Sequence, residues 1–250
     1  MNKIVVIMGS TGVGKSKLSI ELATSFPSEI INCDKMQVYT GLDVTTNKLT
    51  PREQLGVPHH LLAHFDPVVS GEVSNAHFRI AATSTASQIH SRRRIPIAVG
   101  GSTSFIHALV SADHDSPSRP PTPTGYSQSH HPFVTTAASY GSMWLSLCSS
   151  ITSVYVWFGV QGDEVLTGNE RKSMFEEARK ATKDNTCELA KMQVEKIKRL
   201  KGIGWDIRRL DATQVFKAML ASDNKRALEL WNKDVAEPAM EIVEAFLKDE

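Results

Sequence analysis

Eight residues near the start of the chain have the types and the spacing of a phosphate-binding loop. A glycine is followed five residues later by Gly-Lys-Ser, which is the P-loop pattern. Glycines let the backbone curl so that successive N–H groups point at phosphate oxygens. The lysine supplies a positive charge for the terminal phosphate, and the serine hydroxyl is a ligand for Mg²⁺. The eight residues are Gly9, Ser10, Thr11, Gly12, Val13, Gly14, Lys15 and Ser16.

The flanking sequence places this loop where phosphate binding requires it. Lys3–Met8 is an apolar, β-branched run that predicts a buried strand, and Lys15–Phe26 has the apolar spacing of a helix. The positive end of that helix points into the loop, whereas a chance glycine-rich turn would lack this context. We therefore predict a phosphate site with Mg²⁺ as cofactor and Ser16 as its protein ligand.

Two further candidates follow predicted strands. Asp34 ends the strand Glu29–Asp34, and Ser102 follows the glycine pair that closes the strand Ile95–Val99. In open α/β sheets the carboxyl ends of the strands face the ligand crevice. A carboxylate there can act as a base or order a metal-bound water, but it can equally cap a turn. The glycine pair can likewise be explained by a turn that needs the conformational freedom of glycine, without any role in binding. The pair His59-His60 lacks a third ligand at metal spacing, which favours a structural or substrate-loop role.

Strands that alternate with helices predict a P-loop-like α/β fold, with a parallel sheet flanked by helices. Residues 1–112 form the predicted P-loop core, which includes a helix over Ser74–Ser91. Residues 169–250 are predicted to be C-terminal helices that complete the core, with a strand near Trp205–Asp211 and a break or bend at Pro238. The core-facing residues expected in the Ser74–Ser91 helix are Ala76, Phe78, Ile80 and Ala81.

The middle segment, residues 113–168, is predicted to be irregular. Residues 113–132 are rich in Pro, Ser, Thr and His, and residues 133–168 contain aromatics and valines without strand or helix periodicity.

Composition excludes several classes of protein. The 250 residues carry 28 basic and 27 acidic side chains, so no bulk attraction to nucleic acid is indicated. Three separated cysteines do not form a disulfide framework. The apolar runs are too short to cross a bilayer, and a strand that begins at Lys3 leaves no room for a transit peptide. We expect a soluble, intracellular monomer that does not bind membranes, and the compartment stays unassigned.

Four segments together resemble the plant adenylate isopentenyltransferases, the cytokinin-forming enzymes, which are related to tRNA dimethylallyltransferases. They are GSTGVGKSKLSIELA, EIINCDKMQVYTGLDVTTNK, GVPHHLL and PIAVGGSTSFIHALV. The segment NTCELAKMQVEKIKRLKGIGWDIRRLDAT resembles the C-terminal helix and strand of the family. The resemblance covers about residues 3–112 and 184–217.

The resemblance implies transfer of a dimethylallyl group from dimethylallyl diphosphate to the N6 amine of an adenine nucleotide (ATP, ADP or AMP). The P-loop would hold the diphosphate of the donor. Asp34 matches the general base of the family, Thr11 matches a hydroxyl near the reacting centre, and Ser102 matches a position near the nucleotide. A tRNA acceptor is less expected, because the net charge is close to zero.

Departures from the family pattern keep three alternatives open. Met192 stands where the family usually has Arg, Cys33 stands where it usually has Ser, and a GIRKAIG-like segment is missing. The alternatives are a tRNA dimethylallyltransferase, a small-molecule kinase built on the same P-loop, and a catalytically impaired nucleotide-binding remnant. The missing segment favours the remnant, whereas the stretch from DVTTNK to GVPHHLL disfavours the kinase.

Residues 133–151 are predicted to be a reading-frame artefact. A family-like strand, LRYNCCFLWVDVALPVLFEY, can be encoded so that the same bases, read one base later, spell FVTTAASYGSMWLSLCSSI, which is Phe133–Ile151. A frame offset fixes two bases of every codon, so an unbroken chance match is improbable. The offset also explains aromatics without periodicity.

Overall fold

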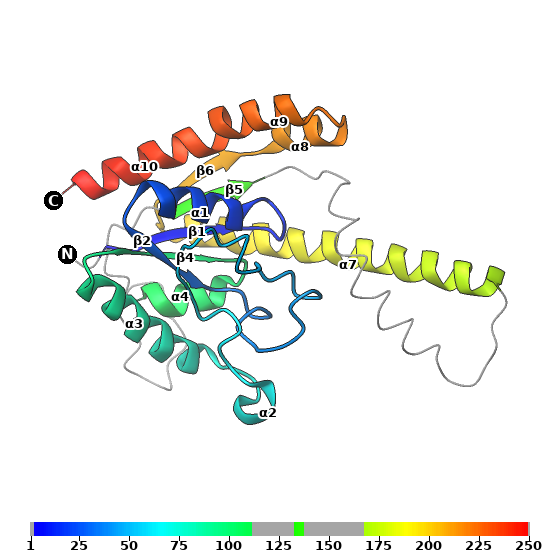
Figure 1. Cartoon of the computed structure of the whole chain (residues 1–250), viewed down its shortest axis with the longest axis horizontal. Coiled ribbons are helices and arrows are strands. Elements are labelled where there is room, and N and C mark those ends of the chain that lie inside the picture. Colours follow the sequence, from blue (N-terminus) through cyan, green and yellow to red (C-terminus); the bar gives the residue numbers. More distant parts are fainter. Residues whose placement is uncertain (1–2, 112–132, 138–167, 250) are drawn as a thin grey trace.

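The computed structural model describes residues 3–111, 133–137 and 168–249 (Figure 1). Their strands form one sheet in the order β3-β2-β4-β1-β5-β6, and every pairing is parallel. The strands are β1 (Val5–Gly9), β2 (Ser28–Asn32), β3 (His59–His60), β4 (Ile95–Gly100), β5 (Phe133–Ala137) and β6 (Ile207–Asp211). The predicted parallel α/β sheet is therefore confirmed.

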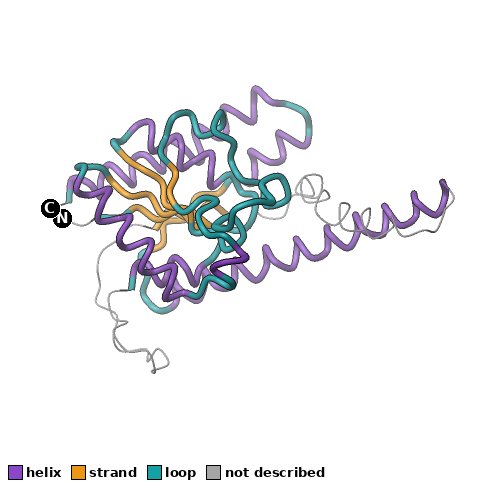
Figure 2. The backbone as a smooth tube through the Cα atoms, turned by 60° about the horizontal axis from the view of Figure 1, so that its bottom comes forward, coloured by secondary structure: helices purple, strands orange, loops and turns teal. Residues whose placement is uncertain are grey.

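Helices cover both faces of the sheet (Figures 1 and 2). One face carries α1 (Lys15–Ser25), α8 (Thr213–Leu220), α9 (Asn224–Trp231), η1 (Asn232–Ala236) and α10 (Glu237–Lys248). The other face carries α3 (Asn75–Ser91), α4 (Thr103–Val110) and α7 (Gly168–Gly202), whose first turns extend beyond the body of the molecule. The short α2 (Pro67–Ser70) lies in the long loop before α3.

Strand β1 shows why the sheet is buried on both sides. Val5 and Ile7 pack in the cluster under α1 and the C-terminal helices, while Val6 and Met8 pack in the cluster under α3 and α4. All four side chains are fully buried. A continuous apolar run is the pattern of a central parallel strand, and each such side chain contributes about 1.5–3 kcal/mol by its burial.

The core face of α3 differs from the predicted one. Phe78, Ala82 and Ile89 are buried against the sheet, whereas Ile80 is 68% exposed and Ala76 is also exposed. The prediction is confirmed for Phe78 and for Ala81, which is half-buried against the same cluster. It was wrong for Ala76 and Ile80 because several apolar residues cluster in the first turns, and only the face that starts at Phe78 continues along the helix.

The middle of the chain contributes a strand that the sequence did not predict. β5 pairs with β1 on one side and with β6 on the other. The prediction of an irregular segment is therefore wrong for Phe133–Ala137, where the open edge of β1 supplies hydrogen-bond partners. The rest of the irregular segment, residues 113–132 and 138–167, lies outside the described residues. The same holds for residues 138–151 of the reading-frame prediction.

The C-terminal region is more helical than predicted. Helix α8 follows β6 directly. The predicted break at Pro238 does not occur, because right-handed helical backbone runs from α9 through the π-helical segment η1 into α10, where Pro238 is in the first turn. Proline cannot donate a backbone hydrogen bond, and the wider π turn accommodates its ring at the start of α10. Among the helices of the described residues, none is long and apolar enough to span a membrane.

Candidate active site

Strand β1 lies at the point where the strand order reverses. The chain leaves β1 toward β4 and β2 on one side, and β5 and β6 later fill the other side. Ligands of open α/β sheets bind beside the carboxyl ends of strands at such a switch point. Gly9–Ser16 connects the carboxyl end of β1 to α1 and so occupies this position.

The loop has the backbone shape that the pattern predicts. Gly12 and Gly14 have φ angles of 78° and 88°, in the left-handed region that favours glycine. Gly14 is the N-cap of α1, and its carbonyl oxygen accepts a hydrogen bond from the N–H of Leu18 at 3.0 Å. The side chains of Ser10 and Val13 are buried, which anchors the loop from below. The positive end of α1 therefore opens onto the loop.

The ammonium group of Lys15 contacts the backbone of the P-loop. Its Nζ donates a hydrogen bond to the carbonyl oxygen of Ser10 at 2.6 Å. Burial lowers the pKa of Lys15 from 10.5 to about 8, and the negative charge of Asp34 acts in the opposite direction. The P-loop follows the carboxyl end of β1 and Asp34 follows that of β2, and both strands pair with β4 in parallel. The fold therefore brings the predicted base and the predicted phosphate-binding lysine to the same edge of the sheet.

Asp34 caps the turn that follows β2. Its Oδ1 accepts hydrogen bonds from the backbone N–H groups of Met36 at 2.9 Å and Gln37 at 3.4 Å. Within the described part of the chain, its Oδ2 forms no hydrogen bond. The capping interpretation is confirmed for one oxygen, and the second oxygen is available for a proton.

Ser102 connects the ends of β2 and β4. It stands at the N-cap of α4, yet its Oγ accepts a hydrogen bond from the backbone N–H of Lys35 at 2.9 Å instead of capping the helix. Gly100 is also required here, because a Cβ at this residue would lie 2.2 Å from the carbonyl oxygen of Cys33. Ser102 therefore holds the turn that carries Asp34, and its predicted proximity to a nucleotide stays a prediction.

Comparisons with known proteins identify the family. The protein-family model described as IPP transferase matches residues 37–138. An adenylate isopentenyltransferase of Humulus lupulus is 38% identical, in an alignment that covers 97% of this chain and 90% of the relative. The chain belongs to the IPP transferase family. Adenylate isopentenyltransferase 1, chloroplastic, of Arabidopsis thaliana is 36% identical over 98% of this chain and 81% of its own length.

A solved structure of a eukaryotic dimethylallyltransferase acting on tRNA has the same fold. The TM-score is 0.73 at 22% identity, with 99% of this chain and 80% of that chain covered. The family assignment disfavours the kinase alternative. It also reveals a difference in length, because the Humulus alignment spans 300 positions and this IPP transferase has 250 residues. At least 50 aligned positions of the relative therefore have no counterpart here.

Two residues of this IPP transferase contact the P-loop without having been predicted. Gln193 of α7 accepts a hydrogen bond from the backbone N–H of Thr11 at 2.7 Å. Trp231 of α9 packs against Gly14. Gln193 directly follows Met192, one of the positions at which the chain departs from the family pattern, but only the fold brings Gln193 to the loop.

The residues present fit a bound Mg²⁺. Ser16 follows Lys15 in the first turn of α1, at the end of the P-loop. Mg²⁺ typically takes few protein ligands and completes its shell with water and substrate phosphates. A hydroxyl at the end of a phosphate-binding loop is such a ligand.

The histidine pair has a structural environment. Nε2 of His60 lies 2.6 Å from Oε2 of Glu29, whose side chain also accepts two hydrogen bonds from Arg92. The Nδ1 of His59 lies 2.8 Å from the carbonyl oxygen of Val57. These contacts support the structural interpretation of the pair.

Proposed function

We propose that this chain transfers the dimethylallyl group of dimethylallyl diphosphate to N6 of an adenine nucleotide (ATP, ADP or AMP), a step of cytokinin biosynthesis. The observation that carries the proposal is the position of Lys15 after β1 and of Asp34 after β2, at the same carboxyl edge of the parallel sheet. The adenylate isopentenyltransferases similar to this chain along nearly its whole length support the same acceptor class.

The donor would bind through its diphosphate. As the allylic C–O bond breaks, negative charge grows on the leaving diphosphate, where the loop N–H groups and the ammonium of Lys15 stabilise it. Mg²⁺, held by Ser16 and the diphosphate oxygens, would supply further charge neutralisation there. The hydroxyl of Thr11 is on the same loop, and the resemblance to the family assigns it a role near the reacting carbon.

The acceptor needs a base, because the exocyclic amine of adenine is a weak nucleophile. A bond forms between N6 and the allylic carbon, diphosphate leaves with the C–O electron pair, and Oδ2 of Asp34 takes the N6 proton. Hydrogen bonds from Met36 and Gln37 fix the carboxylate through its other oxygen. Ser102 fixes the same turn through Lys35.

Incubation with radiolabelled dimethylallyl diphosphate tests the proposal. AMP, ADP, ATP and a tRNA whose anticodon loop holds an unmodified adenosine are offered separately, with Mg²⁺ present. Label in a nucleotide supports the proposal, and label in tRNA alone replaces it by the tRNA alternative. Retained binding of the donor without any product identifies the impaired remnant. The absence of at least 50 positions that the Humulus relative has supports that alternative.

A further inference from the structure

The carboxamide of Gln193 binds two strand ends at once. Its Oε1 accepts a hydrogen bond from the backbone N–H of Thr11 at 2.7 Å, and its Nε2 donates one to the carbonyl oxygen of Gly101 at 3.4 Å. The first contact joins α7 to the P-loop, and the second joins α7 to the end of β4. A carboxamide suits this place because it offers an acceptor and a donor on one planar group.

Gly101 makes room for this contact. A Cβ at Gly101 would lie 2.6 Å from Nε2 of Gln193, a separation that real Cβ atoms do not show. The φ angle of Gly101 does not lie in the left-handed region, so the turn itself does not require glycine here. The glycine therefore serves the approach of the carboxamide.

The same contact reaches the base. Gly101 precedes Ser102, whose Oγ accepts the N–H of Lys35, and Lys35 follows Asp34. A short path of hydrogen bonds and peptide bonds thus runs from the P-loop through the carboxamide to the turn that carries the carboxylate. Gln193 is the side chain that closes this path on the P-loop side.

We propose that Gln193 is a positioning residue that sets the P-loop against the strand ends bearing Asp34. This inference rests on the proposed function, because it assigns the donor diphosphate to the P-loop and the acceptor amine to the carboxylate. Transfer requires the allylic carbon and N6 to lie in line at close range, and a displacement of about 1 Å costs about 10²-fold in rate. Gln193 supplies that alignment through the backbone, because both polar atoms of its carboxamide bind backbone groups.

Two substitutions at Gln193 separate its two hydrogen bonds. Gln193→Ala removes both, and we expect kcat to fall about tenfold or more and the KM for dimethylallyl diphosphate to rise several-fold, with a smaller change in the KM for the nucleotide. Gln193→Glu keeps the acceptor for Thr11 but sets a carboxylate against the carbonyl of Gly101 and near the diphosphate. Its donor affinity should fall further, and more so at low ionic strength.

A double-mutant cycle with Gly101→Ala tests whether the carboxamide acts as described. Gly101→Ala alone pushes the carboxamide away and should reproduce the kinetic defect of Gln193→Ala. In the Gln193→Ala background there is no carboxamide to displace, so Gly101→Ala should add little. Additive effects in the cycle would overturn the proposal, because they would mean that the two residues act separately.

Binding and stability measurements complete the test. Glu188→Gln, an exposed substitution on the same helix, is the matched control and should retain wild-type kinetics and melting temperature. Calorimetric titration with dimethylallyl diphosphate and Mg²⁺ gives donor affinity even without turnover, and we expect it to fall in both Gln193 variants. A lowered melting temperature with unchanged donor affinity and kcat would overturn the positioning role alone. A wild-type chain that does not bind the donor would overturn the proposed function, and this inference with it.

Discussion

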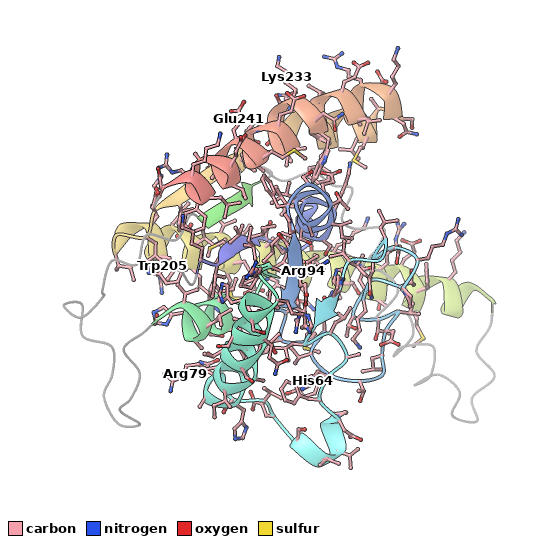
Figure 3. The ribbon with its side chains drawn as sticks, turned by 60° about the vertical axis from the view of Figure 1, so that its left-hand side comes forward. His64, Arg79, Arg94, Trp205, Lys233 and Glu241 are labelled. Atoms are coloured by element: carbon pink, nitrogen blue, oxygen red, sulfur yellow. The ribbon has the colours of Figure 1, made fainter. Side chains whose placement is uncertain are left out.

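The indole of Trp231 lies against the backbone of Gly14, and a Cβ at Gly14 would sit 2.7 Å from its Cη2 atom. The indole Nε1 donates a hydrogen bond to Glu21 of α1 at 2.7 Å, and the ammonium of Lys17 lies 4.2 Å from the ring centroid. The C-terminal helices therefore support the P-loop from behind. Figure 3 shows their opposite side, where Lys233 and Glu241 point outward.

Trp231→Phe should lower stability and weaken donor binding together. Phenylalanine loses the hydrogen bond to Glu21 and leaves a gap beside Gly14, which we expect to cost about 1–3 kcal/mol of unfolding free energy. Urea unfolding measures the loss, and calorimetry with dimethylallyl diphosphate measures the affinity. Leu228→Ala, at an exposed position of the same helix, is the control and should stay within about 0.5 kcal/mol of wild type. Wild-type stability of the Trp231 variant would show that the contact contributes nothing.

Donor affinity should decrease as the pH rises above about 8. Lys15 has a pKa of about 8 before the diphosphate binds, so its ammonium is charged below that pH and neutral above it. Bound diphosphate favours the charged form, and binding near pH 8 should therefore take up protons. Calorimetry in buffers of different ionisation enthalpy measures this uptake. Lys15→Ala should fold normally but lose most of the affinity and the pH dependence. Equal donor affinity in that variant would contradict the assignment of the donor to the P-loop.

Asp34→Asn should separate proton transfer from turn capping. The amide oxygen can still accept the hydrogen bonds of Met36 and Gln37, but the group cannot take a proton. We expect turnover to fall by about 10²–10⁴ with little loss of stability, measured with labelled donor under saturating conditions. Asp34→Ala also loses the cap and should in addition unfold at a lower temperature. Near-normal turnover in Asp34→Asn would mean that another group accepts the N6 proton.

The same variant should shift the pH dependence of binding. The charge of Asp34 raises the pKa of Lys15 against the effect of burial. Removing that charge lets the pKa of Lys15 fall further, so the loss of donor affinity should begin at a lower pH in Asp34→Asn. An unchanged pH profile would show that the two groups do not interact.

Glu29 should make stability sensitive to acid without affecting transfer. Hydrogen bonds from Arg92, followed by those of His60, hold the pKa of this buried carboxyl below its usual value of 4.5. Its stabilising contribution is therefore present above pH 4.5 and is lost as the pH falls through its pKa in the folded protein. Melting curves at pH 3–7 should show the difference between wild type and Glu29→Gln shrinking at the acid end. A changed kcat in Glu29→Gln would contradict the structural role of this cluster.

Local patterns predicted the P-loop, its strand and helix, and the parallel sheet, because each depends on neighbours in the sequence. Gly12 and Gly14 indicate the left-handed backbone of the loop, and the apolar run from Val5 to Met8 indicates a strand that is buried on both faces. Gln193 could not be predicted in the same way, since it meets Thr11 from 182 residues away. β5 was missed because its pairing depends on the free edge of β1 rather than on its own periodicity.

The coding sequence across codons 113–170 should contain a displaced reading frame. The structure sets β5 between β1 and β6, so the stretch with the proposed frame offset begins in a strand of the sheet. The alignment with the Humulus relative also leaves at least 50 positions without counterpart in this chain. We expect the transcript, read one base earlier over residues 133–151, to spell a strand of the WVDV type.

Replacing Phe133–Ile151 by RYNCCFLWVDVALPVLFEY tests the physical consequence. The replacement sets RYNCC at residues 133–137, where β5 now lies, and the apolar run FLWVDV at residues 138–143. We expect that run to pair with β1 in place of β5 and to raise the melting temperature, because a near-continuous apolar run suits a strand between two parallel neighbours. The rate of dimethylallyl transfer should rise only if the replacement also stabilises the carboxyl end of β1, where the P-loop begins. An assay with labelled donor measures that rate. The control exchanges the same residues for a scrambled order of the new segment and should bring no gain in stability. A transcript whose neighbouring frame does not encode such a strand would end the hypothesis, whatever the stability of the replacement.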